Sequence, residues 1–561
     1  MRLSAILCPL CLLFGGSFVK AQSADNDRTA PTAAVTHSSP ADSKSPDPLG
    51  EAKAFLRDGE YDAALQKYQQ LLQERPKSPD AWAGIARVYL KKKDVQQASD
   101  TVSKGLTLAD AWPLHTVLGE IYFRQGRISD AEREWVEVLN AGHRNSRVYL
   151  GLARVRWALS MNDSARLLID KAYQLDPNDP DIENFRSTIR RHSDRLPSTE
   201  GVVAEASASH SEAGLTSFQQ DPSSPRAGRA CTLVSKVNSS DIRMVRMLID
   251  PEHLRGYGLS VAINGEGSTL LLDTGASGIL INREIADKAG LAKLGEARIR
   301  GIGDRGDMQG YLAMVHSIRV AGLEFQDCMV RVADARSVLG RDGLIGADMF
   351  EDFLVDIDFP IETLHLRELP KRPSDTEQQQ ISRATANAGP DNGPKQDDEA
   401  TKGVQLGQPA TSGLTGRYIA PEMKSYTSVY RFGHDLLVRT KVGDAPVKLF
   451  LLDTGSLDNT ISPTVAREVT KVYGEPHAVL KGLNGSVSKL YSASKAVLQF
   501  GHLRQENQEI LAFDLSGVSD DLGTEVSGSL GFTMLRMLDI KIDYRDGLVD
   551  FSYDPKRLIH F

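Results

Sequence analysis

The sequence predicts a multidomain protein in which an all-α repeat region precedes two all-β lobes. Three observations predict this class. Small residues recur about every 34 residues in the first third of the chain, as expected for paired helices. Later segments consist of short apolar runs bounded by turn residues, which is typical of strands. The triplet Asp-Thr-Gly also stands twice at the end of an apolar run, at 273–275 and 453–455.

Length and composition place the chain among ordinary globular proteins. Its 561 residues are too many for one core and suggest about three to four domains. Hydrophobic residues make up 41% of the chain and charged residues 25%. The net charge of -8 is spread along the sequence without a basic stripe, so we expect no nucleic-acid partner.

The N-terminus has the pattern of a secretory signal peptide. Arg2 supplies a positive start, Ile6 to Phe18 form an apolar centre, and Val19-Lys20-Ala21 forms a small-residue exit. We therefore expect cleavage after residue 21 and export to the periplasm or the outside of a bacterial cell, with no membrane span left. An uncleaved anchor is the alternative, but Pro9, Gly15 and Gly16 interrupt a stretch that is short for a bilayer.

Signal cleavage would leave only two cysteines, Cys231 and Cys328. In an exported protein they can form a disulfide, and two buried thiols are the alternative. Residues 22–47 are rich in Ser, Ala, Pro, Asp and Thr without an apolar period, which predicts a disordered spacer.

Residues 48–190 carry a helical repeat. Small residues occur in pairs twelve positions apart, at Ala52 and Ala64, Ala86 and Ala98, Gly119 and Ala131, and Ala153 and Ala165. Such positions let two antiparallel helices approach closely, and large residues such as Tyr68 and Trp135 fill the space between units. The pattern resembles the tetratricopeptide repeat family, with four repeats. The resemblance implies a groove for a peptide or protein partner, and a helical spacer without a ligand is the alternative.

Composition then divides the remaining chain into linkers and lobes. Residues 191–230 and 370–413 are rich in Ser, Pro, Gly and charged residues, which predicts flexible linkers. Between and after them we predict lobe 1 at 231–369 and lobe 2 at 414–561. Strands are expected at Ile242 to Ile249, Tyr257 to Ile263, Leu436 to Val442 and Val447 to Leu452.

The two lobes share landmarks in the same order. A Gly-rich hairpin starts 28 residues after Asp273 and 29 residues after Asp453. An apolar pair ending in glycine follows in each lobe, and then matching strands at 355–359 and 540–544. Three ordered landmarks with a shared ending indicate a duplication.

On these residues each lobe resembles the pepsin and retropepsin superfamily of aspartic proteases. The resemblance implies a retropepsin-like fold for each lobe and a peptide or protein substrate. It implies that Asp273 and Asp453 are the catalytic residues and that the loops around them are supported by Thr274, Gly275, Thr454 and Gly455. The candidate flaps, mobile covers of the site, contain Gly301, Ile302, Gly303, Gly482, Leu483 and Gly485. The apolar-Gly elements are Leu344, Ile345, Gly346, Leu530 and Gly531.

The chemistry of paired carboxylates follows from their charge. Two carboxylates at hydrogen-bonding distance cannot both ionise readily, so they share a proton, and this family is a standard example of that behaviour. One can then accept a proton from water while the other donates to a peptide carbonyl. This chemistry requires no metal, no cofactor and no covalent intermediate, and the sequence has neither a His-Glu-x-x-His metal pattern nor a Gly-x-Ser-x-Gly nucleophile turn.

Lobe 2 is less regular than lobe 1. Asp458 and Asn459 stand where lobe 1 has Gly278 and Ile279, and Ser529 replaces an aliphatic residue. Three hypotheses therefore remain at this point: a single-chain aspartic endopeptidase, a protease that pairs like lobes from two chains, and a non-catalytic peptide-binding scaffold.

Overall fold

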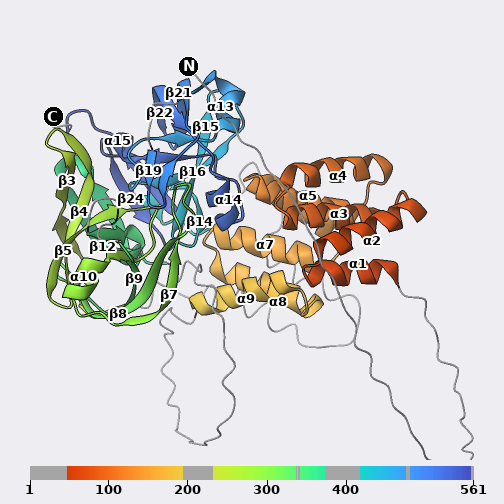
Figure 1. The fold of residues 1–561 in the computed structure, drawn as a ribbon, viewed down its shortest axis with the longest axis horizontal. Helices are drawn as coiled ribbons and strands as arrows, with labels where there is room; N and C mark the ends of the chain where they lie inside the picture. Colours follow the sequence, from red (N-terminus) through yellow and green to blue (C-terminus); the bar gives the residue numbers. More distant parts are fainter. Residues whose placement is uncertain are drawn as a thin grey trace, which may run out of the picture. The chain divides into compact units, whose positions relative to one another are not determined.

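A computed structural model describes residues 47–193, 231–335, 338, 342–372, 417–475 and 480–557 (Figure 1). The predicted signal peptide and almost all of the predicted spacer lie outside these residues, as do most residues of both predicted linkers. Within the described part, helices come first and strands follow, which confirms the predicted fold class.

The helical region begins with four antiparallel pairs, drawn from red to yellow in Figure 1. Their helices are α1 Pro48–Arg57, α2 Tyr61–Glu74, α3 Pro79–Lys91, α4 Val95–Leu108, α5 Trp112–Arg124, α6 Ile128–Asn140, α7 Ser146–Ala158 and α8 Asn162–Leu175. All eight small residues of the repeat are buried. A β-carbon on Gly119 would lie 2.4 Å from Trp135 Nε1, which shows why this position cannot carry a larger side chain.

A further helix, α9 Pro180–Ser193, follows the fourth pair. Its Ile182 and Ile189 are fully buried in the same core as α7 and α8. The sequence predicted four repeats over residues 48–190 and did not predict α9 as a separate helix. The alanine and glycine residues that mark the repeat do not recur in α9, so the repeat pattern gives no signal for it. It covers the apolar end of the stack, as terminal helices of repeat proteins do.

Lobe 1 is built on a nine-stranded sheet with the order β1-β9-β6-β10-β5-β4-β8-β7, in which β3 pairs with β4. Its elements are β1 Thr232–Leu233, β2 Ser240–Arg243, β3 Val245–Asp250, β4 His253–Ile263, β5 Glu266–Asp273, β6 Ile279–Asn282, α10 Arg283–Lys288, β7 Lys293–Ile299, β8 Met308–Val320, β9 Leu323–Ala333, β10 Gly343–Gly346, η1 Ala347–Phe350, β11 Phe353–Asp358, η2 Phe359–Ile361 and β12 Thr363–Glu368. A disulfide joins Cys231, just before β1, to Cys328 on β9, and this settles the alternative left open by the sequence.

Lobe 2 repeats this plan in an eight-stranded sheet with the order β14-β15-β16-β23-β17-β22-β21-β18. Its elements are η3 Pro421–Met423, β13 Thr427–Ser428, β14 Tyr430–Phe432, β15 Asp435–Val442, β16 Lys448–Asp453, β17 Thr460–Ile461, α13 Pro463–Val469, β18 Val472–Gly474, β19 Leu480–Gly482, β20 Gly485–Val487, β21 Tyr491–Phe500, β22 Leu503–Ala512, α14 Ser516–Leu522, β23 Gly528–Gly531, α15 Phe532–Leu535, β24 Asp539–Asp543 and β25 Leu548–Ser552.

The lobes are joined by a six-stranded sheet with the order β13-β25-β24-β11-β12-β2. At its centre β11 of lobe 1 pairs antiparallel with β24 of lobe 2, with Val355 opposite Ile542 and Ile357 opposite Ile540. These are the matching strands that end the two copies. The pairing fixes the lobes to each other through backbone hydrogen bonds and a common apolar core.

One predicted strand is wrong in detail. The apolar run from Ile242 to Ile249 is divided at Met244 into β2, which joins the six-stranded sheet, and β3, which joins the sheet of lobe 1. A continuous pattern of apolar residues does not reveal this change of sheet, because both halves are partly buried.

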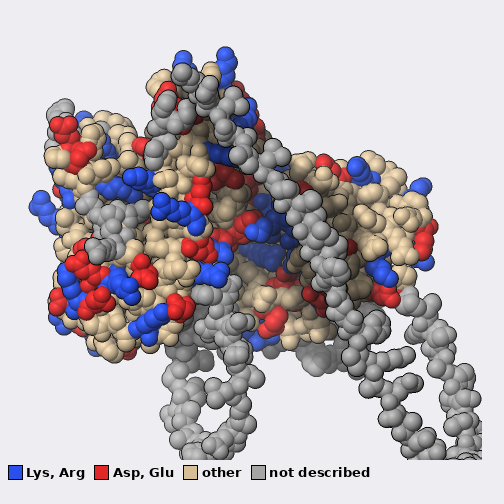
Figure 2. Space-filling model, in the orientation of Figure 1, with Lys and Arg blue, Asp and Glu red and all other residues tan. Residues whose placement is uncertain are grey.

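The helical region packs directly on lobe 2. Tyr430, Leu437 and Leu449 of lobe 2 belong to the same buried apolar cluster as α6 and α7. The buried Arg417 donates to Leu159 O in the helical region and also to Val429 O in lobe 2. On the surface, acidic and basic side chains are intermixed over the strand-rich lobes (Figure 2).

Candidate active site

The structure places Asp273 and Asp453 at the ends of two equivalent strands, β5 and β16. In each lobe the apolar-Gly element runs parallel to this strand, with Gly346 of β10 beside Asp273 and Gly531 of β23 beside Asp453. Both aspartates are nearly buried, with 7% and 8% of their surface exposed. In each lobe the Asp-Thr-Gly triplet and the apolar-Gly element therefore lie side by side, as expected from the sequence.

The two aspartate loops are joined by a reciprocal set of hydrogen bonds. Thr274 N donates to Thr454 Oγ1 and Thr454 N donates to Thr274 Oγ1, both at 3.0 Å. Each hydroxyl then donates across the junction, Thr274 Oγ1 to Leu452 O at 2.8 Å and Thr454 Oγ1 to Leu272 O at 3.1 Å. Every polar group in this buried set has a partner, so the loops are held at a fixed separation.

Gly275 and Gly455 allow the two carboxylates to meet. A β-carbon on Gly455 would lie 2.2 Å from Asp273 Oδ2, and one on Gly275 would lie 2.9 Å from Asp453 Oδ1. Gly275 N donates to Asp273 Oδ1 at 2.8 Å, and Ser456 N donates to Asp453 Oδ1 at 2.9 Å. The aspartates thus hydrogen-bond to their own loops and to each other.

Burial and proximity change the acidity of this pair. Burial first, and then the charge of Asp453, raises the pKa of Asp273 to about 7. Burial also raises the pKa of Asp453. The pair therefore keeps a proton more readily than two separate carboxyl groups would.

The two predicted flaps touch each other. The turn between β7 and β8 contains Gly301, Ile302 and Gly303, and the tight β19–β20 hairpin has Leu483 and Asn484 at its tip. Asn484 N donates to Ile302 O at 2.9 Å, and Arg305 N donates to Asn484 O at 3.1 Å. Glycine is required at these points because a β-carbon on Gly303 would lie 2.3 Å from Asn484 O.

Each flap also packs into the opposite lobe. Leu483 of lobe 2 contacts the apolar cluster of lobe 1 that contains Leu271, Leu280 and Leu344. Ile302 of lobe 1 contacts a cluster of lobe 2 around Phe513 and Leu515. Leu271 lies two residues before Asp273 on β5, so the side chain of Leu483 reaches the apolar wall beside this aspartate.

Two ionisable residues near the aspartates were missed by the sequence analysis. Arg255 of β4 donates from Nη2 to Gly455 O at 2.7 Å, and its charge opposes the rise in the pKa of both aspartates. Asp435 of β15 is also buried, and burial raises its pKa to about 6, with a further contribution from Asp453. Each stands 18 residues before the aspartate of its lobe, a spacing that offers a weak signal in the sequence.

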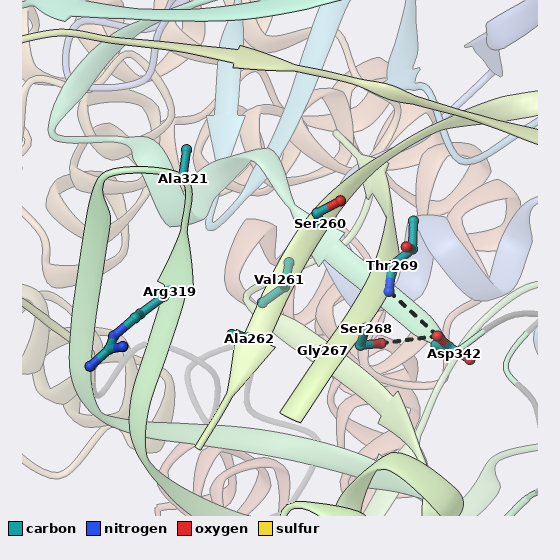
Figure 3. Close-up of a pocket in the computed structure, with 9 residues that line it drawn as sticks. All are labelled: Ser260, Val261, Ala262, Gly267, Ser268, Thr269, Arg319, Ala321 and Asp342. Atoms are coloured by element: carbon teal, nitrogen blue, oxygen red, sulfur yellow. Dashed lines mark hydrogen bonds between the residues drawn. The ribbon is translucent and has the colours of Figure 1, made fainter. Parts of the chain in front are cut away.

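A pocket of about 560 Å³ lies on another part of lobe 1 (Figure 3). It is lined by the β4–β5 hairpin and by Arg319 and Asp342. Ser268 Oγ and Thr269 N both donate to Asp342 Oδ2, at 3.1 and 3.4 Å. Neither aspartate of the pair lines this pocket, so we assign it no part in the site.

Among the described residues, no group of His, Cys, Asp and Glu side chains is arranged to hold a metal ion. In the same part of the chain, no helix has both the length and the apolar character needed to cross a membrane.

Comparison with known families gives matches in both parts of the chain. The aspartyl protease family matches residues 259–349 and 438–534, that is, one segment in each lobe. Two tetratricopeptide repeat families match residues 55–110 and 116–180.

Individual relatives match over shorter stretches. The UBA domain-containing protein Mud1 of Schizosaccharomyces pombe is 28% identical over 116 residues, which cover 20% of this chain and 34% of that protein. DNA damage-inducible protein 1 of Cryptococcus neoformans is 27% identical over 137 residues, covering 22% and 31%. The chain thus spans about a third of the length of the curated relatives it matches. A retropepsin-like aspartic protease from Rickettsia conorii has 20% sequence identity, covers 23% of this chain and 92% of its own, and has a TM-score of 0.18.

The family matches contain both Asp-Thr-Gly triplets, the repeat helices α2 to α4 and α6 to α8, and most of α5. They confirm the resemblance drawn from the sequence. Each lobe of the chain therefore contains a segment that matches the aspartyl protease family, and the helical region before the lobes matches tetratricopeptide repeats.

Proposed function

We propose that the protein is an exported aspartic endopeptidase whose active site is formed within one chain by Asp273 and Asp453. The observation that carries the proposal is the pair itself. Two nearly buried carboxylates are held together by a reciprocal threonine network, and burial and the charge of Asp453 raise the pKa of Asp273 to about 7. Burying two carboxyl groups lowers the stability of the fold, so such a pair is expected where it has a function. Activation of a water molecule for hydrolysis is a function that needs both groups.

The protonation state sets the proposed mechanism. The ionised carboxylate accepts a proton from water, and the water oxygen attacks the peptide carbonyl carbon. The protonated partner donates its proton to the carbonyl oxygen, which gives a neutral tetrahedral diol. When the C–N bond breaks, the leaving amine nitrogen takes a proton from the pair, and one hydroxyl of the diol gives its proton to the other carboxylate. The pair again holds one proton, and no covalent enzyme intermediate is formed.

The flaps give this mechanism a gate. Their tips are hydrogen-bonded to each other, and Leu483 packs against the cluster that contains Leu271, two residues before Asp273. We therefore expect a peptide to enter when these contacts open. Once a peptide is bound, closed flaps exclude water from the pair and supply backbone groups to an extended substrate.

The test is the loss of cleavage on changing either aspartate. Asp273→Asn and Asp453→Asn each remove one carboxylate at nearly constant volume, and each should lower kcat/KM on an unfolded protein substrate at least about 10³-fold. Asp444→Asn is the matched control, since Asp444 is exposed on the β15–β16 hairpin. Full activity in either single variant at acidic to neutral pH rejects the proposal.

The homodimer alternative is separated by testing the variants alone and mixed. If like lobes from two chains form the site, Asp273→Asn leaves a site made of two Asp453 residues and Asp453→Asn leaves one made of two Asp273 residues, so each variant alone should keep part of the activity. If lobe 1 of one chain pairs with lobe 2 of another, the two inactive variants should restore activity when combined. A single-chain site predicts that both variants are inactive, alone and mixed, because each molecule then lacks one member of its own pair. Inactivity of the unmodified protein on every unfolded substrate supports the non-catalytic scaffold instead.

The proposed export has its own test. Expression of the full chain in a bacterium with an intact secretion system should give a mature protein that starts near Gln22 in the periplasm or the medium. Terminal sequencing of the purified protein checks this, and an intact Met1 in the cytoplasm contradicts it.

A further inference from the structure

One face of the helical region carries a connected set of charges. Glu120 of α5 accepts from Arg87 of α3 at 3.1 Å and from Arg147 of α7 at 3.0 Å. Arg147 also pairs with Asp179 and with Asp181, at 3.0 and 2.8 Å. These bonds link α3, α5, α7 and the start of α9, so the first helices of successive pairs present these side chains to a common groove.

The acidic side chains of this groove already form ion pairs with cations of the groove. Although burial opposes ionisation, the charges of Arg147 and Arg87 lower the pKa of Glu120 to about 2. Burial likewise opposes ionisation of Asp181, yet Arg147 and Lys91 lower its pKa strongly, and Lys91 bonds to it at 2.6 Å. Glu120 and Asp181 thus remain ionised, and all three acids of the set are paired with cations.

Two further cations in the groove have no acid of their own. Arg154 of α7 is half-buried and interacts electrostatically with Glu120, Asp181, Arg147 and Arg124. Its guanidinium lies 5.8 Å from the ring centre of Phe185. In the part of the chain that the structure describes, neither Arg154 nor Arg124 has an ion pair. Figure 2 shows Lys and Arg side chains gathered in a hollow at the level of α7. The groove is therefore complementary to additional negative charge.

The groove is held rigidly against the protease lobes. Thr524 Oγ1 of lobe 2 donates to Phe123 O at the end of α5, at 2.7 Å, and Lys93 pairs with Asp520 of α14 at 2.7 Å. The Nη1 atom of Arg124 lies 3.7 Å from where a β-carbon on Gly523, the C-cap of α14, would stand. A tethered domain would need none of these contacts to recruit a partner.

The same short helix, α14, also contacts the flap between β7 and β8. Asp521 of α14 pairs with Arg300 at the base of the flap. Val518 of α14 contacts the cluster that receives Ile302 and also the apolar cluster of the helical region. Contacts of this one short helix therefore connect the groove with the flap between β7 and β8.

We propose that this cationic groove is an exosite for an acidic segment of the peptide substrate, held by Arg124 and Arg154. This inference rests on the proposed protease function. A fixed distance between groove and active site is what an exosite requires, because one chain must occupy both at once. The acids of α14 do not repel such a segment strongly, since Asp520 and Asp521 are each paired with a cation.

Two peptide substrates with the same cleavable core test the exosite. One carries an extension of flexible linker and ten Glu, and the other carries the same linker and ten Gln. We expect kcat/KM to be about tenfold higher for the Glu substrate at low salt, and this preference should fall as salt screens the charges. Arg124→Gln/Arg154→Gln should reduce the preference to less than about twofold. The matched control Lys104→Gln/Lys171→Gln removes two exposed positive charges from α4 and α8 and should keep it.

A binding measurement separates failure of the exosite from failure of the protease. Fluorescein-labelled decaglutamate is titrated into the Asp273→Asn protein and followed by anisotropy, with decaglutamine as reference. Tighter binding of decaglutamate that depends on Arg124 and Arg154, together with the cleavage preference, supports the proposal. Equal cleavage of both substrates overturns it, and binding without a cleavage preference assigns the groove to a separate acidic partner. If neither substrate is cleaved by the unmodified protein, the proposed function fails and the exosite with it, whatever the anisotropy shows.

Discussion

The two lobes support their aspartate loops by different chemistry. In lobe 1 the support is a carboxylate on the apolar-Gly side, where Asp348 accepts from Gly278 N at 2.9 Å and from Ser277 Oγ at 3.3 Å. In lobe 2 the equivalent position after the glycine is Thr533, and the hydrogen bond between the two segments runs in the opposite direction. There Asn459 of the aspartate loop accepts from Gly531 N at 2.8 Å.

The irregular residues of lobe 2 therefore have a structural purpose. Asn459 Nδ2 donates to Gln505 Oε1 and Asn507 Oδ1, and Thr460 Oγ1 hydrogen-bonds to Ser529 Oγ at 2.8 Å. In lobe 2, amide and hydroxyl groups therefore make the hydrogen bonds that support the aspartate loop, whereas in lobe 1 the carboxyl group of Asp348 makes them. The comparison teaches that the same loop geometry can be kept by different residues, so departure from a family pattern does not by itself show a degraded site.

The largest effect should come from the one feature that the lobes share equally. Thr274→Val removes a hydroxyl and leaves Thr454 N and Leu452 O buried without partners, and Thr454→Val does the same to Thr274 N and Leu272 O. Each should lower the free energy of unfolding in urea by about 3 kcal/mol and kcat/KM by tenfold or more. Thr274→Ser and Thr454→Ser keep the hydroxyl and serve as controls. A large loss in only one lobe would show that the junction is not reciprocal.

The sequence predicted the fold well because its signals are local. The repeat period and the small residues such as Ala86 and Ala98 determine how neighbouring helices pack, and that packing involves residues close in the sequence. The Asp-Thr-Gly triplets stand at strand ends, where the chain turns, so their position could be read from apolar runs. The interlobe sheet could not be predicted in this way, because the pairing of β11 with β24 joins residues almost 200 positions apart.

The candidate site was predictable only in its central residues. Contacts such as Asn484 with Ile302 and Thr524 with Phe123 depend on how whole elements dock. Docking leaves no repeating pattern of residues in the sequence, so these contacts could not be predicted from it. Arg255 was missed for the same reason, since a single arginine on a strand is ordinarily a solvated residue. Its role depends on Gly455 O, which belongs to the other lobe.

The next prediction separates the charged support from the neutral one. Asp348→Asn keeps an oxygen for Gly278 N but removes a charge that interacts with the guanidinium groups of Arg331 and Arg431. It should cost about 1 kcal/mol, roughly half the cost of Asp348→Ala. In lobe 2, Asn459→Asp should cost about 2 kcal/mol, as much as Asn459→Ala, because a carboxylate cannot donate to Gln505 or Asn507.

Urea unfolding of these four variants measures the difference. Exposed Asp444→Asn again controls for the loss of one negative charge. If Asn459→Asp is tolerated while Asp348→Asn is as damaging as Asp348→Ala, the assignment of charged and neutral support to the two lobes is wrong.

The smallest effect should appear where the lobes meet. Position Asp356 of lobe 1 corresponds to Lys541 in the matching strand of lobe 2, and the two residues face each other across β11 and β24. Burial first, and then a hydrogen bond with Asp539 and its charge, raises the pKa of Asp356 to about 7. The folded protein therefore holds a proton between about pH 4 and pH 7 that the unfolded chain has released.

The sign of the pH dependence follows from that proton. Stability due to Asp356 is fully present below about pH 4, declines as pH rises to about 7 and is constant above. Asp356→Asn should remove this carboxyl's share, on the order of 1 kcal/mol after screening by solvent, and flatten the curve of unfolding free energy against pH. The raised pKa of Asp273 adds a slope of the same sign, so the comparison is made in the Asp273→Asn background. An unchanged slope there would show that Asp356 does not hold this proton and would contradict the prediction.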